Sequence, residues 1–151
     1  MDLQSIRKKI YQYCAYQERS ENQVKEKLKN LGLNDEQKVH EFIEELKAEK
    51  FLNEERYLQS FVRGKFRNCQ WGKQKIIYEL SLQNFQESAI LHALEEIQED
   101  EYYQTLYQLA IKKLRSLQSD EQAYLKTQKY LYQKGFETEL IEKVLKEIFK
   151  K

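Results

Sequence analysis

The fold is decided by a short helix-ending segment, LKNLGL at residues 28–33, which recurs as LSLQNF at 80–85 and as LYQKGF at 131–136. Each copy has a leucine, an anchor residue four positions later and an apolar residue directly after the anchor. The anchors Gly32, Asn84 and Gly135 are separated by 52 and 51 residues. A repeat of this length is typical of helical arrays, in which each unit buries its apolar face against its neighbours.

Each anchor is followed by an apolar series that supports the repeat. Its members stand three, four and seven residues after the first, so they lie on one face of a helix. They are Val39, Phe42, Ile43 and Leu46 in the first copy, Ile90, Ala93, Leu94 and Ile97 in the second, and Ile141, Val144, Leu145 and Ile148 in the third. We therefore expect Leu28, Leu80 and Leu131 to occupy equivalent, buried positions.

Capping and helix-ending residues predict nine helices and no strands. The approximate bounds are 5–17, 20–31, 35–50, 53–67, 73–83, 86–97, 101–117, 120–135 and 138–149. The expected N-caps are Ser20 for the second helix, Asn34 or Asp35 for the third, Asn53 for the fourth, and Ser119 or Asp120 for the eighth. Gln23 completes a capping-box pattern with Ser20, and the anchors can take the left-handed conformation that ends a helix.

These helices predict an all-α fold, an elongated array of three tandem three-helix repeats. Short loops make sequential helices neighbours, so we place the repeats at 1–52, 53–99 and 100–151. A unit of this size buries little surface alone, and contacts between units should contribute to stability. Such an array is more often a binding surface than an enzyme.

The composition excludes several other classes. Among 151 residues there are no prolines and four glycines, so we expect no linker. No apolar stretch approaches the length of a membrane span, and the first residues lack the apolar core of a signal peptide. We therefore expect a cytoplasmic protein with no membrane partner, in which Cys14 and Cys69 are free thiols.

The charges are arranged in blocks, although the net charge is only +1. Residues 56–75 hold six bases and no acid, whereas residues 76–111 hold seven acids and no lysine or arginine. Helix surfaces normally mix the two signs. The basic block is either a solvated surface or a working surface for a partner, and we favour the second interpretation.

Aromatic residues interleave with these bases, and they include Phe61 and Trp71. Arginine and tryptophan anchor protein interfaces, and basic with aromatic residues also bind nucleic-acid backbones. Trp71 could instead close the core of its repeat. Gly64 is either a weak point of the fourth helix or a place where a partner's backbone approaches. The candidate partner-binding residues are Arg56, Arg63, Lys65, Arg67, Trp71, Lys73 and Lys75.

No enzyme constellation is present in the sequence. It contains neither a phosphate-binding P-loop nor a dinucleotide-binding glycine turn. His40 and His92 have no second histidine four residues on and no cysteine partner, so neither is placed to hold a metal. We expect no cofactor, no metal and no catalytic activity.

Residues 51–80, FLNEERYLQSFVRGKFRNCQWGKQKIIYEL, resemble the central signature of the RecX family of regulatory proteins. The matching residues are Phe51, Leu52, Asn53, Arg56, Tyr57, Phe61, Val62, Arg63, Gly72, Ile76, Glu79 and Leu80. Residues 14–28, CAYQERSENQVKEKL, are similar to the family's opening repeat. The chain departs from the family at Gln70 and Trp71, where a second glycine is common, and its third unit lacks a comparable signature.

The resemblance implies three tandem three-helix repeats and a RecA-type recombinase filament as the partner. It also implies a protein that restrains the filament's ATPase and strand exchange in DNA repair. DNA inside the filament is a further candidate contact, and we expect a monomer. The main alternative is a helical module that acts directly on DNA, because three-helix units can mimic helix-turn-helix domains. The near balance of acids and bases counts against it, and an uncatalogued enzyme is the third hypothesis.

Overall fold

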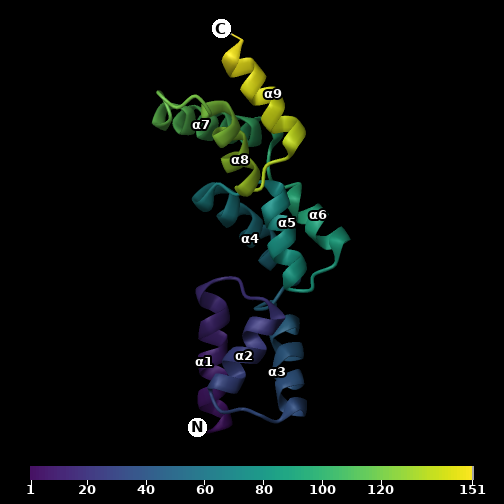
Figure 1. The fold of residues 1–151 in the computed structure, drawn as a ribbon. Coiled ribbons are helices and arrows are strands. Elements are labelled where there is room, and N and C mark those ends of the chain that lie inside the picture. The colour runs from purple at the N-terminus through teal and green to yellow at the C-terminus, as the bar shows by residue number, and fades with distance from the viewer. Residues whose placement is uncertain (151) are drawn as a thin grey trace. The chain divides into compact units, whose positions relative to one another are not determined.

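The computed structural model describes residues 1–150, and this part of the chain forms nine helices and no strands (Figure 1). The helices are α1 (Leu3–Tyr16), α2 (Glu21–Asn30), α3 (Glu36–Ala48), α4 (Glu54–Cys69), α5 (Lys73–Leu82), α6 (Glu87–Leu94), α7 (Glu99–Ser116), α8 (Ala123–Gln133) and α9 (Thr138–Phe149). The all-α prediction is confirmed.

The three anchors adopt the same backbone conformation at the ends of α2, α5 and α8. Their φ angles are +95° at Gly32, +67° at Asn84 and +101° at Gly135, all in the left-handed region. The N–H after each anchor donates to the carbonyl of the leucine four positions before it, at 3.0, 3.3 and 3.2 Å. This is the six-to-one bond of the Schellman motif, which satisfies carbonyls that the helix itself leaves free.

The leucine of each copy is fully buried, as predicted. Leu28, Leu80 and Leu131 each have 0% exposure. The apolar series after each anchor is largely buried as well, and Val39 and Ile148 are its half-buried members. The same local sequence thus makes the same turn and buries the same side chain three times.

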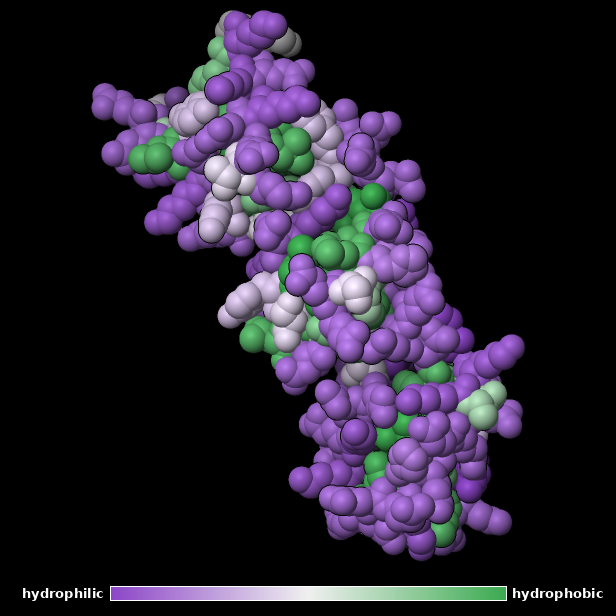
Figure 2. All heavy atoms as spheres, turned by 90° about the vertical axis from the view of Figure 1, so that its right-hand side faces the viewer, coloured by the Kyte–Doolittle hydropathy of each residue, from purple (hydrophilic) through white to green (hydrophobic). Residues whose placement is uncertain are grey.

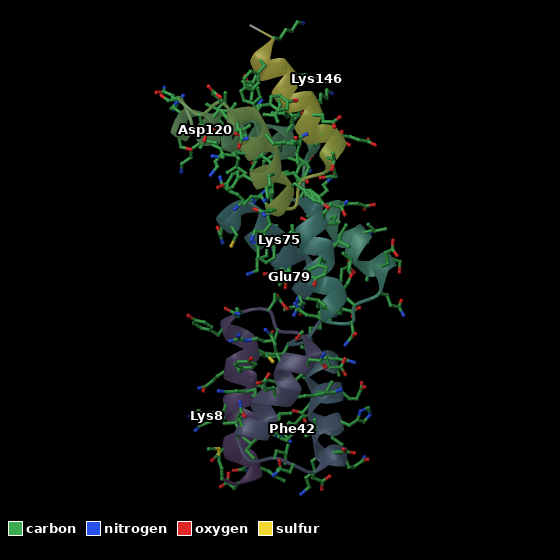
Figure 3. All side chains as sticks on the ribbon, viewed as in Figure 1. Lys8, Phe42, Lys75, Glu79, Asp120 and Lys146 are labelled. Carbon is green, nitrogen blue, oxygen red and sulfur yellow. The ribbon has the colours of Figure 1, made fainter. Side chains whose placement is uncertain are left out.

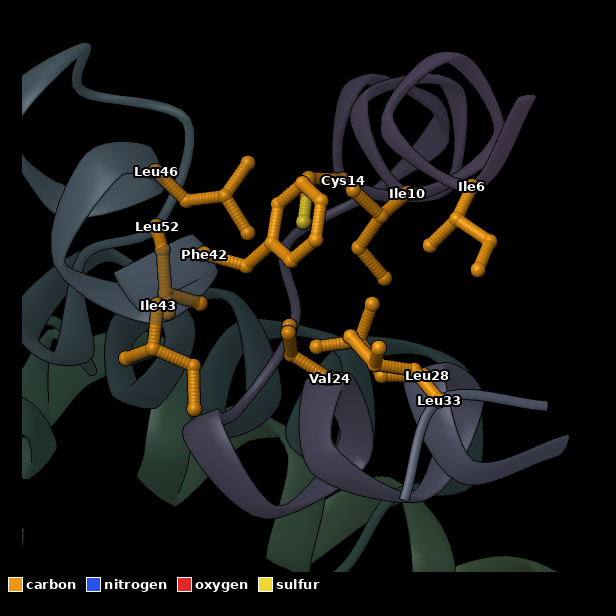
Figure 4. Close-up of a cluster of buried hydrophobic side chains, with 10 residues drawn as sticks. All are labelled: Ile6, Ile10, Cys14, Val24, Leu28, Leu33, Phe42, Ile43, Leu46 and Leu52. Atoms are coloured by element: carbon orange, nitrogen blue, oxygen red, sulfur yellow. The ribbon is translucent and has the colours of Figure 1, made fainter. Parts of the chain in front are cut away.

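Packing divides the described chain into two compact units, Met1–Ser60 and a second unit that begins at Phe61. In the first unit, α1, α2 and α3 enclose one apolar core (Figure 4). Its members are Ile6, Ile10, Cys14, Val24, Leu28, Leu33, Phe42, Ile43, Leu46 and Leu52. At its edge, Glu45 accepts hydrogen bonds from Arg7 and Tyr11. These two bonds hold the pKa of Glu45 below its usual value.

Two predicted helix ends differ from the observed ones by three residues, and the other ends differ by two residues or fewer. Helix α6 ends at Leu94, and residues 95–97 continue as a tighter turn whose N–H groups bond three residues back. Helix α8 begins only at Ala123, with Gln122 rather than Ser119 or Asp120 as its N-cap. Asp120 instead forms a turn of its own, because its carboxylate accepts a hydrogen bond from the Gln122 N–H at 2.8 Å.

Candidate partner-binding site

The candidate site is positioned by a junction between the start of α5 and the end of α8, both in the second unit (Figure 1). The Gly72 N–H donates to the Lys134 carbonyl at 2.7 Å, and the Gln74 N–H donates to the Gly135 carbonyl at 2.9 Å. A helix start leaves N–H groups unsatisfied and a helix end leaves carbonyls unsatisfied. Here each end satisfies the other.

Only glycine fits at this junction. A Cβ added at Gly72 would overlap the backbone of Gly135 and Phe136. Gly135 is doubly constrained, since its φ is +101° and a Cβ there would overlap Lys75. Gly72, the glycine that matches the family signature, therefore lies where two backbone segments meet.

Tyr102 of α7 completes the junction. Its hydroxyl accepts a hydrogen bond from the Lys73 N–H at 2.9 Å and donates to the Glu137 carboxylate. Its ring lies between Phe66 and Phe136, at centroid distances of 5.8 and 5.1 Å. Burial and the bond to Glu137 raise the pKa of Tyr102, so the hydroxyl stays protonated and available as a donor.

Trp71 stands at this junction with three lysines, and we call Lys65, Trp71, Lys75 and Lys134 the cationic cluster. The Lys65 and Lys75 ammonium groups lie 4.9 and 4.5 Å from the centre of the indole ring. The Lys134 ammonium donates to the Cys69 carbonyl at 2.7 Å. All four side chains are half-buried. Trp71 is thus the centre of a basic surface rather than a closed core residue.

The lysines of the cationic cluster have no carboxylate partner within residues 1–150. Partial burial, and then the positive charge of Lys75, lower the pKa of Lys134. Because the Lys65 and Lys75 ammonium groups lie 4.9 and 4.5 Å from the same ring centre, they still repel at ordinary salt, where the screening length is about 8–10 Å. Such a cluster is stabilised when an external anion arrives.

The three arginines of the predicted site are placed differently, because each already faces a carboxylate. Arg56 contacts both oxygens of Glu18 at 3.1 and 3.2 Å. Arg63 lies 3.6 Å from Glu96, and Arg67 lies 3.4 Å from Glu101. These side chains are about half exposed, so the pairs orient the arginines more than they stabilise the fold.

The predicted set therefore separates into parts. Lys65, Trp71 and Lys75 come together, whereas the Lys73 ammonium lies 4.7 Å from the ring of Tyr102. Lys134 joins the cluster although it stands 59 residues after Lys75 in the sequence. In the sequence, Lys134 is marked only by its position next to the anchor Gly135. That position does not predict that the end of α8 contacts the start of α5.

Other kinds of site are weakly represented in the described chain. Among residues 1–150, no three His, Cys, Asp or Glu side chains gather as metal ligands would. No described helix combines the length and apolar character that a membrane crossing requires. Cys14 is buried and Cys69 is exposed, and both are free thiols. Burial raises the pKa of Cys14 to about 11, so this thiol stays protonated.

Models of the RecX family match two parts of this chain. The model of the second three-helix domain of RecX matches residues 53–94, and that of the third three-helix domain matches residues 99–145. The first of these ranges contains Lys65 on α4, Trp71 in the turn that follows it, and Lys75 on α5. The second contains Lys134.

Known RecX proteins are similar to this chain over most of its length. A regulatory protein RecX from Oceanobacillus iheyensis is 30% identical over 138 residues, which cover 90% of this chain and 50% of the relative. One from Clostridium botulinum is 34% identical over 133 residues, which cover 85% and 61%. The chain thus spans only part of the length of these curated relatives. The crystal structure of RecX from Lactobacillus salivarius has the same fold, with a TM-score of 0.81 at 24% identity over 97% of this chain and 98% of that one.

The fold and the cationic cluster define a helical-repeat protein with a basic aromatic surface. The chain belongs to the RecX family of regulatory proteins.

Proposed function

We propose that this chain binds a RecA-type recombinase filament and lowers its ATPase and strand-exchange activity in DNA repair. Membership in a family of regulatory proteins supports a role in controlling another protein. The observation that carries the proposal is the cationic cluster, in which Lys65 and Lys75 lie against Trp71 and Lys134 bonds to the nearby Cys69 carbonyl, without an acid partner in the described chain. A surface of this kind is suited to an acidic face on a partner.

The cluster is also rigidly held, which favours binding. The hydrogen bonds of Gly72 and Gln74 fix the turn that carries Trp71 and the start of α5, which carries Lys75. A surface fixed before binding loses less conformational entropy when the partner arrives. Complementary charge then sets orientation and association rate more than final affinity.

Inhibition would follow from holding neighbouring filament subunits in one state. A ligand that binds one conformation more tightly shifts the population toward it. ATP turnover at subunit interfaces would slow if that conformation is not the one that hydrolyses. We propose that the chain is divided into three repeats at 1–52, 53–99 and 100–151, and that the second and third repeats carry the cationic cluster.

The partner-binding set proposed from the sequence can now be weighted by its contacts. Lys65, Trp71, Lys75 and Lys134 are proposed to meet the partner directly. Lys73 supports the junction through Tyr102. Arg56, Arg63 and Arg67 are already paired with carboxylates, so we propose that they contribute mainly by shaping α4 and its surroundings.

The test is the ATPase of a RecA filament on single-stranded DNA. We expect this chain to inhibit below one molecule per recombinase subunit, because a linear polymer can propagate a local block. An unchanged ATPase at saturating protein would refute the proposal. The control is the same titration with protein that has been heat-denatured.

Direct action on DNA is the competing function, since the same lysines suit phosphates. A DNA-binding module should lose affinity steeply with salt, by about 0.9 log units per log unit of salt for each phosphate neutralised on duplex DNA. We expect weak, salt-sensitive binding to naked DNA and tighter binding to the filament. Nanomolar binding to naked DNA at physiological salt, with no preference for the filament, would favour the alternative.

A further inference from the structure

Helix α5 has a second patterned face, directed away from its core. Ile76 and Leu80 are fully buried, but Tyr78 and Leu82 are 62% and 60% exposed. One side of the helix carries Lys75 and the residues three, four and seven positions after it, because this spacing places side chains on the same face. These residues are Tyr78, Glu79 and Leu82. Two large apolar side chains on the outside of so short a helix mark a surface that is suited to a partner.

A groove runs between this face and the segment that joins α8 to α9. Its volume is about 740 Å³, and it lies wholly within the second unit. The lining includes Lys75, Tyr78 and Glu79 on one side, and Tyr132 and Glu139 on the other. Tyr132 is 60% exposed, like Tyr78. We call this feature the tyrosine groove.

The charge reverses along the tyrosine groove. Lys75 lines it and also belongs to the cationic cluster, so the groove continues from a positive surface. Lys75 and Glu79 are both labelled on α5 in Figure 3. Glu79 stands one helical turn further on, about 6 Å along the axis. Glu137 and Glu139 line the groove at the start of α9.

This reversal selects between two classes of ligand. A DNA strand carries a phosphate about every 3.4 Å of helix axis. A strand that reached from the lysines into the groove would therefore set phosphates against Glu79 and Glu139. A protein segment can change sign within a few residues, and it can also present an apolar side chain to two exposed tyrosines.

The exposed side chains of this face also suit a protein ligand. Hydrophobic side chains reach the surface among hydrophilic ones on the face of the molecule that Figure 2 shows. Tyrosine anchors contribute large contact area at a low cost in conformational entropy. Exposed tyrosines beside a lysine cluster thus suit a ligand that is partly apolar and partly acidic.

We propose that the cationic cluster and the tyrosine groove together dock one segment of the partner protein. The segment has Asp or Glu residues that meet Lys65, Lys75 and Lys134, followed by a large apolar side chain that lies between Tyr78 and Tyr132. That this segment belongs to the recombinase rests on the proposed function. The site itself rests on the charges and the exposed tyrosines.

Photo-crosslinking from the groove tests this directly. The full chain carries p-benzoyl-phenylalanine in place of Tyr78, or in place of Tyr16 as a control that is 83% exposed in the first unit. Each variant is bound to a RecA filament on single-stranded DNA, irradiated and mapped by mass spectrometry. We expect the Tyr78 variant to cross-link to a recombinase peptide that contains Asp or Glu, and the Tyr16 variant to cross-link far less.

Co-sedimentation of each variant with the filament is measured before irradiation. If wild type and variants all fail to co-sediment, the proposed function fails. If the Tyr78 variant co-sediments but cross-links only to DNA, only to a second copy of this chain, or no more than the Tyr16 variant, the docking site is wrong and the proposed function stands.

A charge reversal gives an independent readout of the same site. Lys75→Glu should weaken filament binding about tenfold or more, because like charges across an interface are strongly unfavourable. Lys8→Glu makes the same charge change at an exposed position of the first unit and should change affinity less than about twofold. Equal affinities for the two variants would overturn the assignment.

Discussion

The arginines of α4 and the lysines around Trp71 come from one acid-free stretch of sequence, yet they lie in different electrostatic surroundings. Arg56, Arg63 and Arg67 each face a glutamate within 3.6 Å. Lys65 and Lys75 face an indole ring instead. The fold neutralises one part of the basic block and leaves the other available.

The difference follows from where the acids of the next block lie. Glu96 and Glu101 belong to the acidic stretch 76–111, and the packing of the second unit brings them back to α4. The turn at Trp71 meets the end of α8 instead, which brings Lys134. A run of like charges in the sequence therefore predicts a binding surface only for those residues that form no ion pair within the fold.

The largest expected effect comes from removing a buried leucine that supports both regions. Leu80→Ala should lower the free energy of unfolding by about 2–5 kcal/mol, because it opens a cavity in a fully buried position. Leu82→Ala is the matched control at a 60% exposed position two residues away. Denaturant unfolding of both variants measures the difference, and equal losses would refute the repeat-based assignment.

The next effect concerns the contact between Gly72 and Gly135, which positions the lysines around Trp71 but not the arginines of α4. Gly72→Ala should destabilise by about 1–3 kcal/mol, since its Cβ overlaps the Gly135 backbone. Gly64→Ala should stabilise by up to about 1 kcal/mol, because Gly64 lies inside α4 with open space around its Cα. Thermal unfolding should shift in opposite directions for the two variants. A shift in the same direction would mean that the junction is not a tight contact.

A smaller effect tests whether the arginines act internally. Arg67→Glu should cost about 1 kcal/mol or less, because the pair with Glu101 is partly exposed. Adding Glu101→Arg should restore stability, and the double variant should inhibit the filament within about threefold of the wild type. If the double variant regains stability but not inhibition, Arg67 contacts the partner and the contrast between arginines and lysines is weaker than we infer.

The smallest expected effect on stability is at Lys134. Lys134→Gln removes the repulsion from Lys75 and also a hydrogen bond to Cys69, so the net change should stay within about 0.5 kcal/mol. Its binding to the filament should nevertheless fall. Chemical unfolding and filament co-sedimentation of the same preparation separate the two, and a loss of more than about 2 kcal/mol would make Lys134 a structural residue.

Much of the fold could be predicted because its signals are local. A glycine or asparagine that takes a positive φ, and a leucine four residues before it, identify each helix end from a few residues. The α8 start was missed because Asp120 binds the Gln122 N–H in a turn, which competes with capping a helix.

The candidate site could be predicted only in part. The acid-free basic stretch 56–75 contains Lys65, Trp71 and Lys75, so the local sequence predicts them as candidate binding residues. The partners of Arg63 and Arg67, and the arrival of Lys134, depend on tertiary packing between segments more than 30 residues apart. The outer face of α5 was missed because its apolar residues resemble core positions until burial distinguishes Leu80 from Leu82.

The most direct measurement compares the two regions in one assay, the ATPase of a RecA filament on single-stranded DNA. The variants are Lys65/Lys75/Lys134→Gln and Arg56/Arg63/Arg67→Gln, which remove the same number of charges. Circular dichroism first confirms that both are folded. We predict that the lysine variant needs about tenfold more protein for half inhibition, and that the arginine variant stays within about threefold of the wild type. Loss of inhibition by the folded arginine variant, with the lysine variant acting as the wild type does, would contradict the account.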